Sequence, residues 1–253
     1  MLEAHGVTHQ GLVRPTNEDG LVHDADLGLF VVADGMGGHS AGEVASRLAL
    51  ESVHTFIRRT KDDEEFTWPF GVDLRLSFDA NRVRTALRLA NRRAFQVSES
   101  GAEFAGMGTT LVTVLITGSR LTYAAVGDSR LYSVRDRALS RLTEDDSWIA
   151  TLRAREPDLD EEQLKRHPLR HVITKAIGML ADTDVEIHER TLIAGEVLLL
   201  CTDGLHDMVS DREIQEVLAE RASLQASADR LLAQALERGG RDNVTALLVR
   251  YDG

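Results

Sequence analysis

The chain has 253 residues, of which 43% are hydrophobic, and this content is enough to bury a substantial core. Its 41 acidic residues outnumber 29 Lys and Arg residues, giving a formal net charge of −12, which excludes a general binder of nucleic acid or of anionic membranes because such contacts depend on excess Lys and Arg. The first residues are too polar for a signal peptide and no apolar run approaches the roughly 20 residues of a membrane span, so we expect a cytoplasmic protein.

Two amphipathic helices are predicted in the first half of the chain. Apolar residues recur at steps of three and four within 42–59 and again within 79–97. Asp79 is placed to cap the N-terminus of the second helix. The acidic stretch 61–72 between the two helices is predicted to be an exposed connection.

Short β-rich runs fill residues 109–142 and are broken only at TGSR, GDSR and RDRA. Breaks of that length join antiparallel neighbours, because a parallel crossover needs about a dozen residues or more. We therefore predict an antiparallel meander. The charged and weakly patterned residues 143–178 that follow are predicted to be a mobile segment over a functional site.

The last part of the chain is predicted to combine strands with a second pair of helices. Strands are expected at 186–192, 196–202 and 244–251, and helices within 211–222 and 226–240. Gly239 is the expected helix stop, and the lone Cys201 is expected to be a core residue. Helices placed before and after a run of strands favour helix pairs on the outer faces of antiparallel sheets. We therefore predict one α+β domain over residues 1–253.

Five acidic clusters adjoin the predicted strands. Asp34 and Asp203 each end an apolar run and are each followed by glycine, in FVVADG and LLLCTDG. The other clusters are Glu18 with Asp19 in RPTNEDG, Asp128 in GDSR and Asp242 in GRDNV. Carboxylates that meet at one sheet edge repel one another unless a cation compensates them. Because Mg²⁺ and Mn²⁺ prefer oxygen ligands, the recurrence favours a metal site over five unrelated turns.

A cation stands close to these acids in the sequence. Arg14 lies four residues before Glu18, and a guanidinium can bind a phosphate bidentately. Spacing alone leaves two interpretations open, a phosphate ligand and an ordinary surface arginine. Together with hard divalent cations, the first interpretation indicates phosphoryl chemistry.

The ordered motifs RPTNEDG, FVVADGMGG, GMGTTLV, YAAVGDSRLY, LLLCTDGLHD and GRDNVTALLV resemble the metal-dependent serine/threonine protein phosphatases of the PP2C type (PPM family), in their compact bacterial form. The resemblance runs from Gly6 to Tyr251. It implies a sandwich of two central antiparallel β-sheets flanked by pairs of helices, with 143–178 as the family's variable flap. It also implies hydrolysis of phosphoserine and phosphothreonine in proteins by a hydroxide that bridges two Mn²⁺ or Mg²⁺ ions, without a phospho-enzyme.

The same resemblance implies a role for each acidic motif. Asp34 corresponds to the aspartate that bridges the two metals, and the Gly35 carbonyl corresponds to a ligand of the second. Asp203 and Asp242 correspond to ligands of the first metal. Glu18 corresponds to an acid that holds the second metal through bound water.

Two further roles and several departures complete the comparison. Asp128 corresponds to a ligand of a third, weaker ion, and Arg14 to the arginine that binds the substrate phosphate. Met36 stands where animal members carry a proposed general-acid histidine, and leaves a metal-bound water or His39 as alternatives. His206 stands where many relatives have tryptophan, and we interpret it as packing. The flap residues to which no individual role is assigned are Glu144, Asp145, Asp146, His167 and Arg170.

Three functions compete at this point. The leading hypothesis is an active phosphatase, expected to be a monomer, that acts on phosphoproteins and opposes a bacterial-type serine/threonine kinase. The second is a catalytically dead relative that binds phosphoproteins, which the intact acidic set disfavours. The third is a phosphatase devoted to one regulatory partner.

Overall fold

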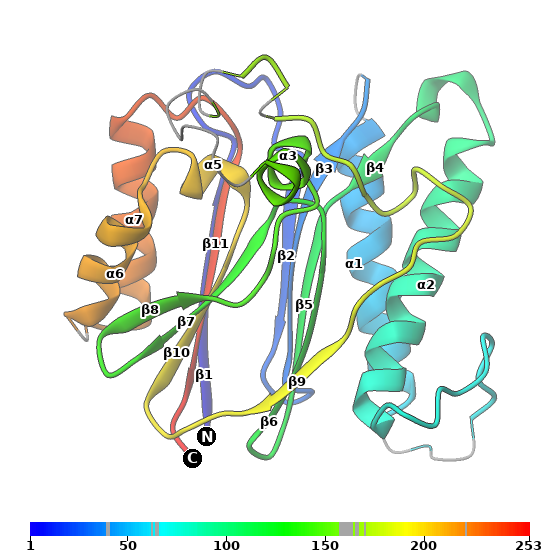
Figure 1. The fold of residues 1–253 in the computed structure, drawn as a ribbon, viewed down its shortest axis with the longest axis horizontal. Coiled ribbons are helices and arrows are strands. Elements are labelled where there is room, and N and C mark those ends of the chain that lie inside the picture. Colours follow the sequence, from blue (N-terminus) through cyan, green and yellow to red (C-terminus); the bar gives the residue numbers. More distant parts are fainter. Residues whose placement is uncertain are drawn as a thin grey trace.

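The strands form two antiparallel sheets that pack face to face, as Figure 1 shows for the computed structural model. The structure describes residues 1–38, 41–61, 63, 66–156, 164, 167–169, 171–220 and 222–253. The first sheet has the order β1 (Leu2–His9), β11 (Val244–Tyr251), β10 (Glu196–Cys201), β7 (Arg130–Arg135), β8 (Ala138–Arg141). The second has the order β2 (Asp19–Asp24), β3 (Leu29–Met36), β5 (Leu111–Thr117), β6 (Arg120–Val126), β9 (His188–Thr191), and β4 (Gly108–Thr109) pairs with β3.

Helix pairs cover the outer faces of both sheets (Figure 1). The longer helices are α1 (Ala41–Arg59) and α2 (Phe78–Ser98) on the second sheet, and α6 (Asp211–Ala219) and α7 (Leu224–Glu237) on the first. Shorter helices are a 3₁₀ turn (Ala102–Phe104), α3 (Trp148–Arg155) and α5 (Asp203–His206). The predicted sandwich of two antiparallel sheets with flanking helices is confirmed.

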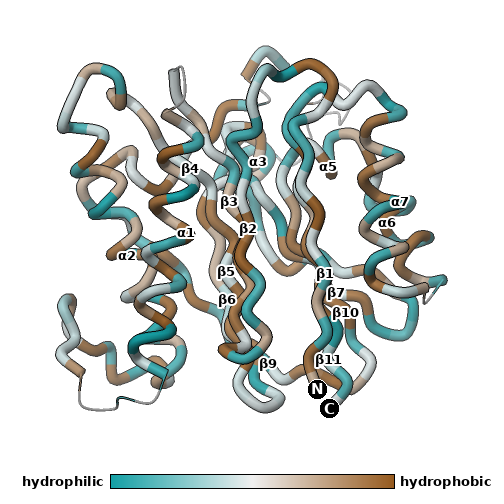
Figure 2. Tube along the Cα trace, turned by 180° about the vertical axis from the view of Figure 1, so that it is seen from behind, coloured by the Kyte–Doolittle hydropathy of each residue, from teal (hydrophilic) through white to brown (hydrophobic). Residues whose placement is uncertain are grey.

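Apolar side chains fill three interfaces between these layers. Consecutive residues of a strand point to opposite faces of a sheet, so Leu29 packs toward α1 and α2 while Phe30 packs between the sheets. A third cluster joins the first sheet to α6 and α7, and the buried Cys201 belongs to it. Figure 2 shows that hydrophobic residues concentrate along the central strands. Burial of each large apolar side chain contributes about 1.5–3 kcal/mol, so the two sheets are held rigidly together.

The predicted meander is wrong at GDSR. The β5–β6 and β7–β8 hairpins are present, but β6 belongs to the second sheet and β7 to the first. The chain therefore crosses between the sheets at Gly127, whose φ of 98° is rarely adopted by residues with a side chain. A Cβ on Gly127 would lie 2.7 Å from the Thr110 side chain. The crossing places Asp128 between the ends of both sheets.

The predicted cap of α2 is also wrong. Ser77, not Asp79, caps this helix, because its hydroxyl accepts a hydrogen bond from the Ala80 amide at 3.1 Å. Asp79 instead accepts from the Arg82 guanidinium at 2.9 Å, one turn along the helix.

Two segments have structure that the sequence analysis did not predict. The N-terminal residues, for which no strand was expected, form β1 and pair with β11. The acidic connection before α2 is partly packed, because the Phe66 ring lies 5.6 Å from Phe56 of α1 and 4.4 Å from Trp68. Aromatic packing, which the charged neighbours obscured, anchors this connection.

The two chain ends lie together at one end of the sandwich (Figure 1), where the Met1 amino group donates to the Gly253 carbonyl at 2.5 Å. The loops that carry the acidic motifs gather at the other end, around α3 and α5 (Figure 1). Among the described residues, no helix has the length and apolar character needed to cross a membrane.

Candidate active site

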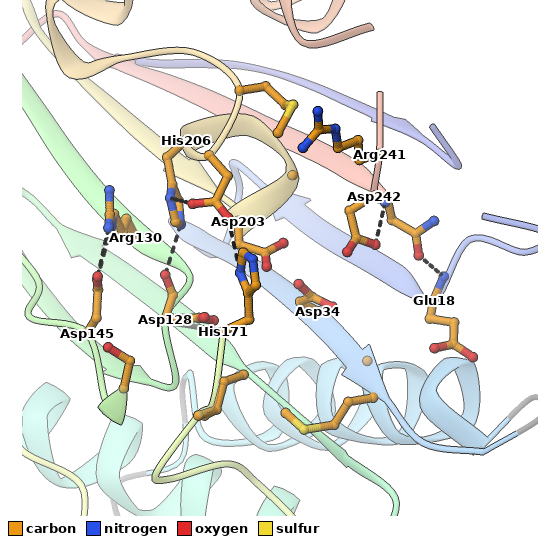
Figure 3. Close-up of a pocket in the computed structure, with 18 of the residues that line it drawn as sticks. Glu18, Asp34, Asp128, Arg130, Asp145, His171, Asp203, His206, Arg241 and Asp242 are labelled. Atoms are coloured by element: carbon orange, nitrogen blue, oxygen red, sulfur yellow. Dashed lines mark hydrogen bonds and ion pairs between the residues drawn. The ribbon is translucent and has the colours of Figure 1, made fainter. Parts of the chain in front are cut away.

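An open cleft of about 1080 Å³ lies at the end of the sandwich that carries the acidic motifs. Its walls come from the strand ends of both sheets, from the loop before β2 and from the flap (Figure 3). All seven residues to which the sequence assigned metal or phosphate roles line it: Arg14, Glu18, Asp34, Gly35, Asp128, Asp203 and Asp242.

Asp34 is held by backbone contacts on both sides of its Cα. Its amide donates to the Thr110 hydroxyl at 3.0 Å, and its carbonyl accepts from the Thr110 amide at 2.8 Å. The strand was expected to end at Asp34, but it continues to Met36 because residues 35 and 36 pair with β4. This extension fixes the direction of the Asp34 side chain (Figure 3).

Close backbone contacts explain the glycines beside Asp34. A Cβ on Gly35 would lie 2.1 Å from the Gly42 carbonyl oxygen and 2.7 Å from that of Glu18. A Cβ on Gly42 would lie 2.5 Å from the Glu18 carboxylate. Residues without side chains therefore let the start of α1, the end of β3 and the Glu18 loop meet at one side of the cleft.

Three of the partly buried acidic residues that line the cleft have raised pKa values. Burial, and next the Asp19 carboxylate, raise the pKa of Asp34 well above its usual range. Burial, and next the Asp128 carboxylate, raise the pKa of Asp203 to about 7. Burial, and next the Asp145 carboxylate, raise the pKa of Asp128 to about 6. Each group resists ionisation mainly because it is desolvated, and also because another carboxylate is close.

Among the acidic residues that line the cleft, two oxygens are buried without a hydrogen-bond partner among the described residues, Oδ1 of Asp128 and Oδ1 of Asp203. A buried carboxylate oxygen without a partner is costly in a folded protein. Both residues line the cleft, together with Asp34 and Asp242. An oxygen-rich donor set with unsatisfied oxygens fits hard divalent cations such as Mn²⁺ and Mg²⁺.

Asp19 lies next to Asp34 on the adjacent strand and is held there by two threonines, a role that the sequence did not assign. It lies opposite Asp34 in the β2–β3 register. Its Oδ2 accepts from the hydroxyls of Thr202 at 2.9 Å and Thr245 at 2.7 Å. Asp19 is the first residue of β2 and does not line the cleft, whereas its neighbour Glu18 lies in the preceding loop and does.

Arg14 is attached to the acidic cluster by an ion pair. Its Nη2 donates to Oδ2 of Asp242 at 2.6 Å, while 54% of its side chain stays exposed. Asn243 holds the loop that carries Arg14, because Nδ2 of Asn243 donates to the carbonyls of Gln10 at 2.9 Å and Thr16 at 2.8 Å. The rest of the guanidinium makes no hydrogen bond to described residues, so it can bind an anion.

His206 forms a hydrogen bond in addition to its packing contacts. Its side chain is only 3% exposed, and its Nε2 donates to the Asp128 carbonyl at 3.1 Å. Its Nδ1 lies 3.4 Å from Oδ1 of Asp207. The imidazole therefore links the sheet crossing at Asp128 to the end of α5, which the interpretation as packing did not include (Figure 3).

The described part of the flap is tied to the wall of the cleft. The Arg130 guanidinium forms a fork with Asp145, at 3.0 Å from Nε and 2.7 Å from Nη2. The Asp146 amide donates to the Gly127 carbonyl at 2.8 Å, beside Asp128. Two residues that the sequence singled out, His39 and Arg170, lie outside the described residues.

Comparisons with known proteins agree with this geometry. The family model described as protein phosphatase 2C matches residues 16–248. A serine/threonine phosphatase stp of Listeria monocytogenes is 33% identical over 97% of this chain and 94% of its own length. The crystal structure of the Mycobacterium tuberculosis serine/threonine phosphatase PstP/Ppp superimposes with a TM-score of 0.86, at 36% identity, covering 100% of this chain and 99% of that one. A structure of the PstP catalytic domain in complex with two manganese ions gives a TM-score of 0.83 at 35% identity, over 98% of this chain and 97% of that one.

Proposed function

We propose a residue-level function on the premise that this chain belongs to the protein phosphatase 2C family. It is a metal-dependent serine/threonine protein phosphatase, and its substrates are phosphoproteins. The observation that carries the residue-level proposal is the convergence of Asp34, Asp128, Asp203 and Asp242 in one cleft, where one oxygen of Asp128 and one of Asp203 are buried without a partner among the described residues.

In this proposal, two Mn²⁺ or Mg²⁺ ions bind at the acidic cluster. Their ligands are Asp34, the Gly35 carbonyl, Asp203, Asp242 and Glu18. Bound cations of this kind activate water and neutralise charge on the phosphoryl group. A third, weaker ion lies at Asp128. Burial and the neighbouring carboxylates raise the pKa of Asp34, and this supports the assignment, because a bound cation would stabilise the ionised carboxylate.

The chain's own residues orient the reaction. Arg14 binds the substrate phosphate with the edge of its guanidinium that Asp242 leaves free. Thr110 holds Asp34 in place from both sides of its backbone. Met36 lines the cleft and cannot donate a proton, so the leaving seryl or threonyl oxygen is protonated by another group.

The remaining parts of the proposal concern the whole protein. One catalytic domain spans residues 1–253, with a variable flap at 143–178 that selects among substrates. The enzyme is a monomer and opposes a serine/threonine protein kinase. The names of the relatives support phosphoproteins as substrates. A kinase is proposed because these proteins must be phosphorylated before they can be substrates.

The experiment that tests this function is release of phosphate from matched phosphoserine, phosphothreonine and phosphotyrosine peptides in Mn²⁺. We expect release from the first two and little from the third. Asp34→Ala, which removes the proposed bridging ligand, is the control and is expected to be inactive. Equal activity of Asp34→Ala and wild type would overturn the assignment.

A further inference from the structure

An arginine on the rim of the cleft has no role in the function proposed above. Arg241 is exposed, lines the cleft and directly precedes Asp242. Three other arginines of the cleft, Arg14, Arg130 and Arg141, each pair with a carboxylate. Arg241 makes no hydrogen bond or ion pair to the residues that the structure describes (Figure 3). Its guanidinium, which carries only donors, is therefore available to an anion from outside the chain.

The side chain of Arg241 leaves the phosphate position of Arg14 free. Asp242 faces Arg14, to which the 2.6 Å ion pair joins it. Arg241 instead runs back along the end of α7, where its Cγ and Nε lie 3.8 and 3.9 Å from the place that a Cβ on Gly239 would take. Figure 3 shows it extending from Asp242 toward α5, whereas Glu18 lies on the other side of Asp242. Arg14 and Arg241 therefore offer two separate positions to anions.

Backbone contacts hold the turn that carries Arg241. The Gly240 amide donates to the Ala235 carbonyl of α7 at 3.1 Å, and the Gly240 carbonyl accepts from the Leu12 amide at 2.7 Å. Gly240 has a φ of 46°, and a Cβ there would lie 3.0 Å from Cγ of Leu12. The turn at 239–242 and the loop at 12–14 thus form one continuous surface, which we call the rim surface.

The rim surface combines apolar contact area with positive charge. Leu12 and Val13 are 65% and 67% exposed, and they precede Arg14. The two arginines, Arg14 and Arg241, stand out in a chain whose formal net charge is −12. A local positive charge of this kind attracts acidic segments of a partner. The partner that the rim surface fits is therefore an acidic stretch of a phosphoprotein.

A substrate whose phosphate is bound at Arg14 brings its neighbouring residues close to Arg241. Arg241 adjoins Asp242 in the sequence, so its guanidinium lies within the length of one long side chain of the Arg14–Asp242 pair. An extended peptide advances about 3.3–3.6 Å per residue, so its next few residues cover this span. A guanidinium binds a carboxylate bidentately, which gives such a contact a defined geometry.

We propose that Arg241 binds an acidic side chain, Glu or Asp, that lies one to three residues from the phosphoresidue of the substrate. The proposal deepens the proposed function and rests on it, because phosphate bound at Arg14 sets the position of the peptide. Arg241 reaches no reacting atom in this arrangement. It selects among substrates, and its contribution falls on KM for the acidic ones.

The test is kcat/KM on phosphothreonine peptides that carry a single Glu at each of the three positions on either side, with Gln at the others. At low salt we expect wild type to prefer Glu over Gln at one or more positions by about fivefold, the upper range for an exposed ion pair. In Arg241→Gln this ratio should fall to about 1. In about 1 M salt, where the screening length is about 3 Å, wild type should lose the preference too.

Two further variants test the charge and the geometry of the contact. Arg241→Lys should retain part of the preference, since an ammonium keeps the charge without the planar fork. Arg241→Glu should reverse it, so that a peptide with Lys at the same position is hydrolysed faster than the Gln peptide. A reversal of this kind cannot come from a general loss of structure.

Arg120→Gln is the matched control. Arg120 is also exposed, and it begins β6 at the end of the sandwich opposite the cleft (Figure 1). This variant changes the net charge by the same amount as Arg241→Gln and should keep the wild-type ratio of Glu to Gln peptides. A lower ratio in Arg120→Gln would mean that net charge alone sets the preference, and would overturn the inference.

The remaining outcomes separate this inference from the proposed function. Phosphate release with no preference for Glu at any position, or with the same preference in wild type and Arg241→Gln, would overturn the inference alone. Equal losses on Glu and Gln peptides in Arg241→Gln would do so as well, because they would assign Arg241 a structural role. Absence of phosphate release from every peptide by wild type in Mn²⁺ would overturn the proposed function.

Discussion

Asp34 shows how strongly function and stability oppose each other at a single residue. It is partly buried among carboxylates, and its raised pKa reports the free energy needed to ionise it without a cation. The threonines around it fix its position and donate nothing to its carboxylate among the described contacts. The site is therefore arranged for a bound cation at the expense of the metal-free fold.

Asp34→Asn should consequently lower phosphatase activity and raise the stability of the metal-free protein. We expect loss of nearly all phosphatase activity, because the variant lacks the carboxylate proposed to bridge the two metal ions. In EDTA at pH 8 we expect the variant to be more stable than wild type, by about 1 kcal/mol or roughly 2–4 °C in Tm for a chain of this size. Thermal melts of both proteins check this, and a lower Tm for the metal-free variant would show that the carboxylate stabilises the fold.

Arg14→Ala should mainly raise KM for phosphopeptides. Loss of a charge-assisted contact that is half exposed is expected to lower kcat/KM by one to two orders of magnitude, about 1.4–2.7 kcal/mol. Arg14→Lys should recover only part, since an ammonium lacks the planar fork. Steady-state kinetics on one phosphothreonine peptide give the comparison, and wild-type kcat/KM in Arg14→Ala would identify a surface arginine.

At the level of elements, the crossing between β6 and β7 is the feature that assembles the site. Gly127→Ala should destabilise the protein by about 1–3 kcal/mol, because the new Cβ meets Thr110 and the positive φ is strained. Gly118→Ala is the matched control, as Gly118 also has a positive φ but faces open space. Denaturant unfolding should show the larger loss at Gly127. Equal losses would mean that backbone strain alone matters.

The flap should affect specificity more than stability. None of the residues of α3 is buried, whereas Leu164 is only 3% exposed. A deletion within 150–170 that spares Leu164, such as removal of 150–156, where no residue is buried, forfeits little apolar burial. We expect a Tm close to wild type and altered relative rates on several phosphopeptides. A collapse of Tm with unchanged preferences would show the segment to be structural.

The elements that the sequence predicted well are those with a local signal. Helical periodicity located α1 and α2, and Asp-Gly at the end of an apolar run located Asp34 and Asp203. The crossing at Asp128 escaped prediction, because a four-residue break looks the same whether the next strand joins the same sheet or the other.

For the whole molecule, the acidic cluster sets how stability depends on pH. The folded-state pKa values of Asp203, about 7, and Asp128, about 6, exceed the unfolded value near 4. Groups with raised pKa contribute stability that is complete below the unfolded value and is lost as the pH rises through the folded one. Metal-free protein should therefore melt at a lower temperature at pH 8 than at pH 5.5.

Added Mn²⁺ should remove this penalty at pH 8, because ionised carboxylates bind the cation and binding to the folded state raises its stability. Melting curves at both pH values, with EDTA or with Mn²⁺, contain the full comparison. Metal-free protein that is as stable at pH 8 as at pH 5.5 would mean that the buried carboxylates are already compensated within the chain.

The central claim is that the acidic cleft catalyses phosphate release only when it holds divalent cations. Its most direct test is to remove metal with EDTA, exchange the buffer, and follow phosphate release from a phosphothreonine peptide as Mn²⁺ is added back. We expect no turnover in the chelated protein and recovery that saturates with Mn²⁺, with Asp203→Ala inactive throughout. Full turnover by the thoroughly chelated wild-type protein would contradict the account.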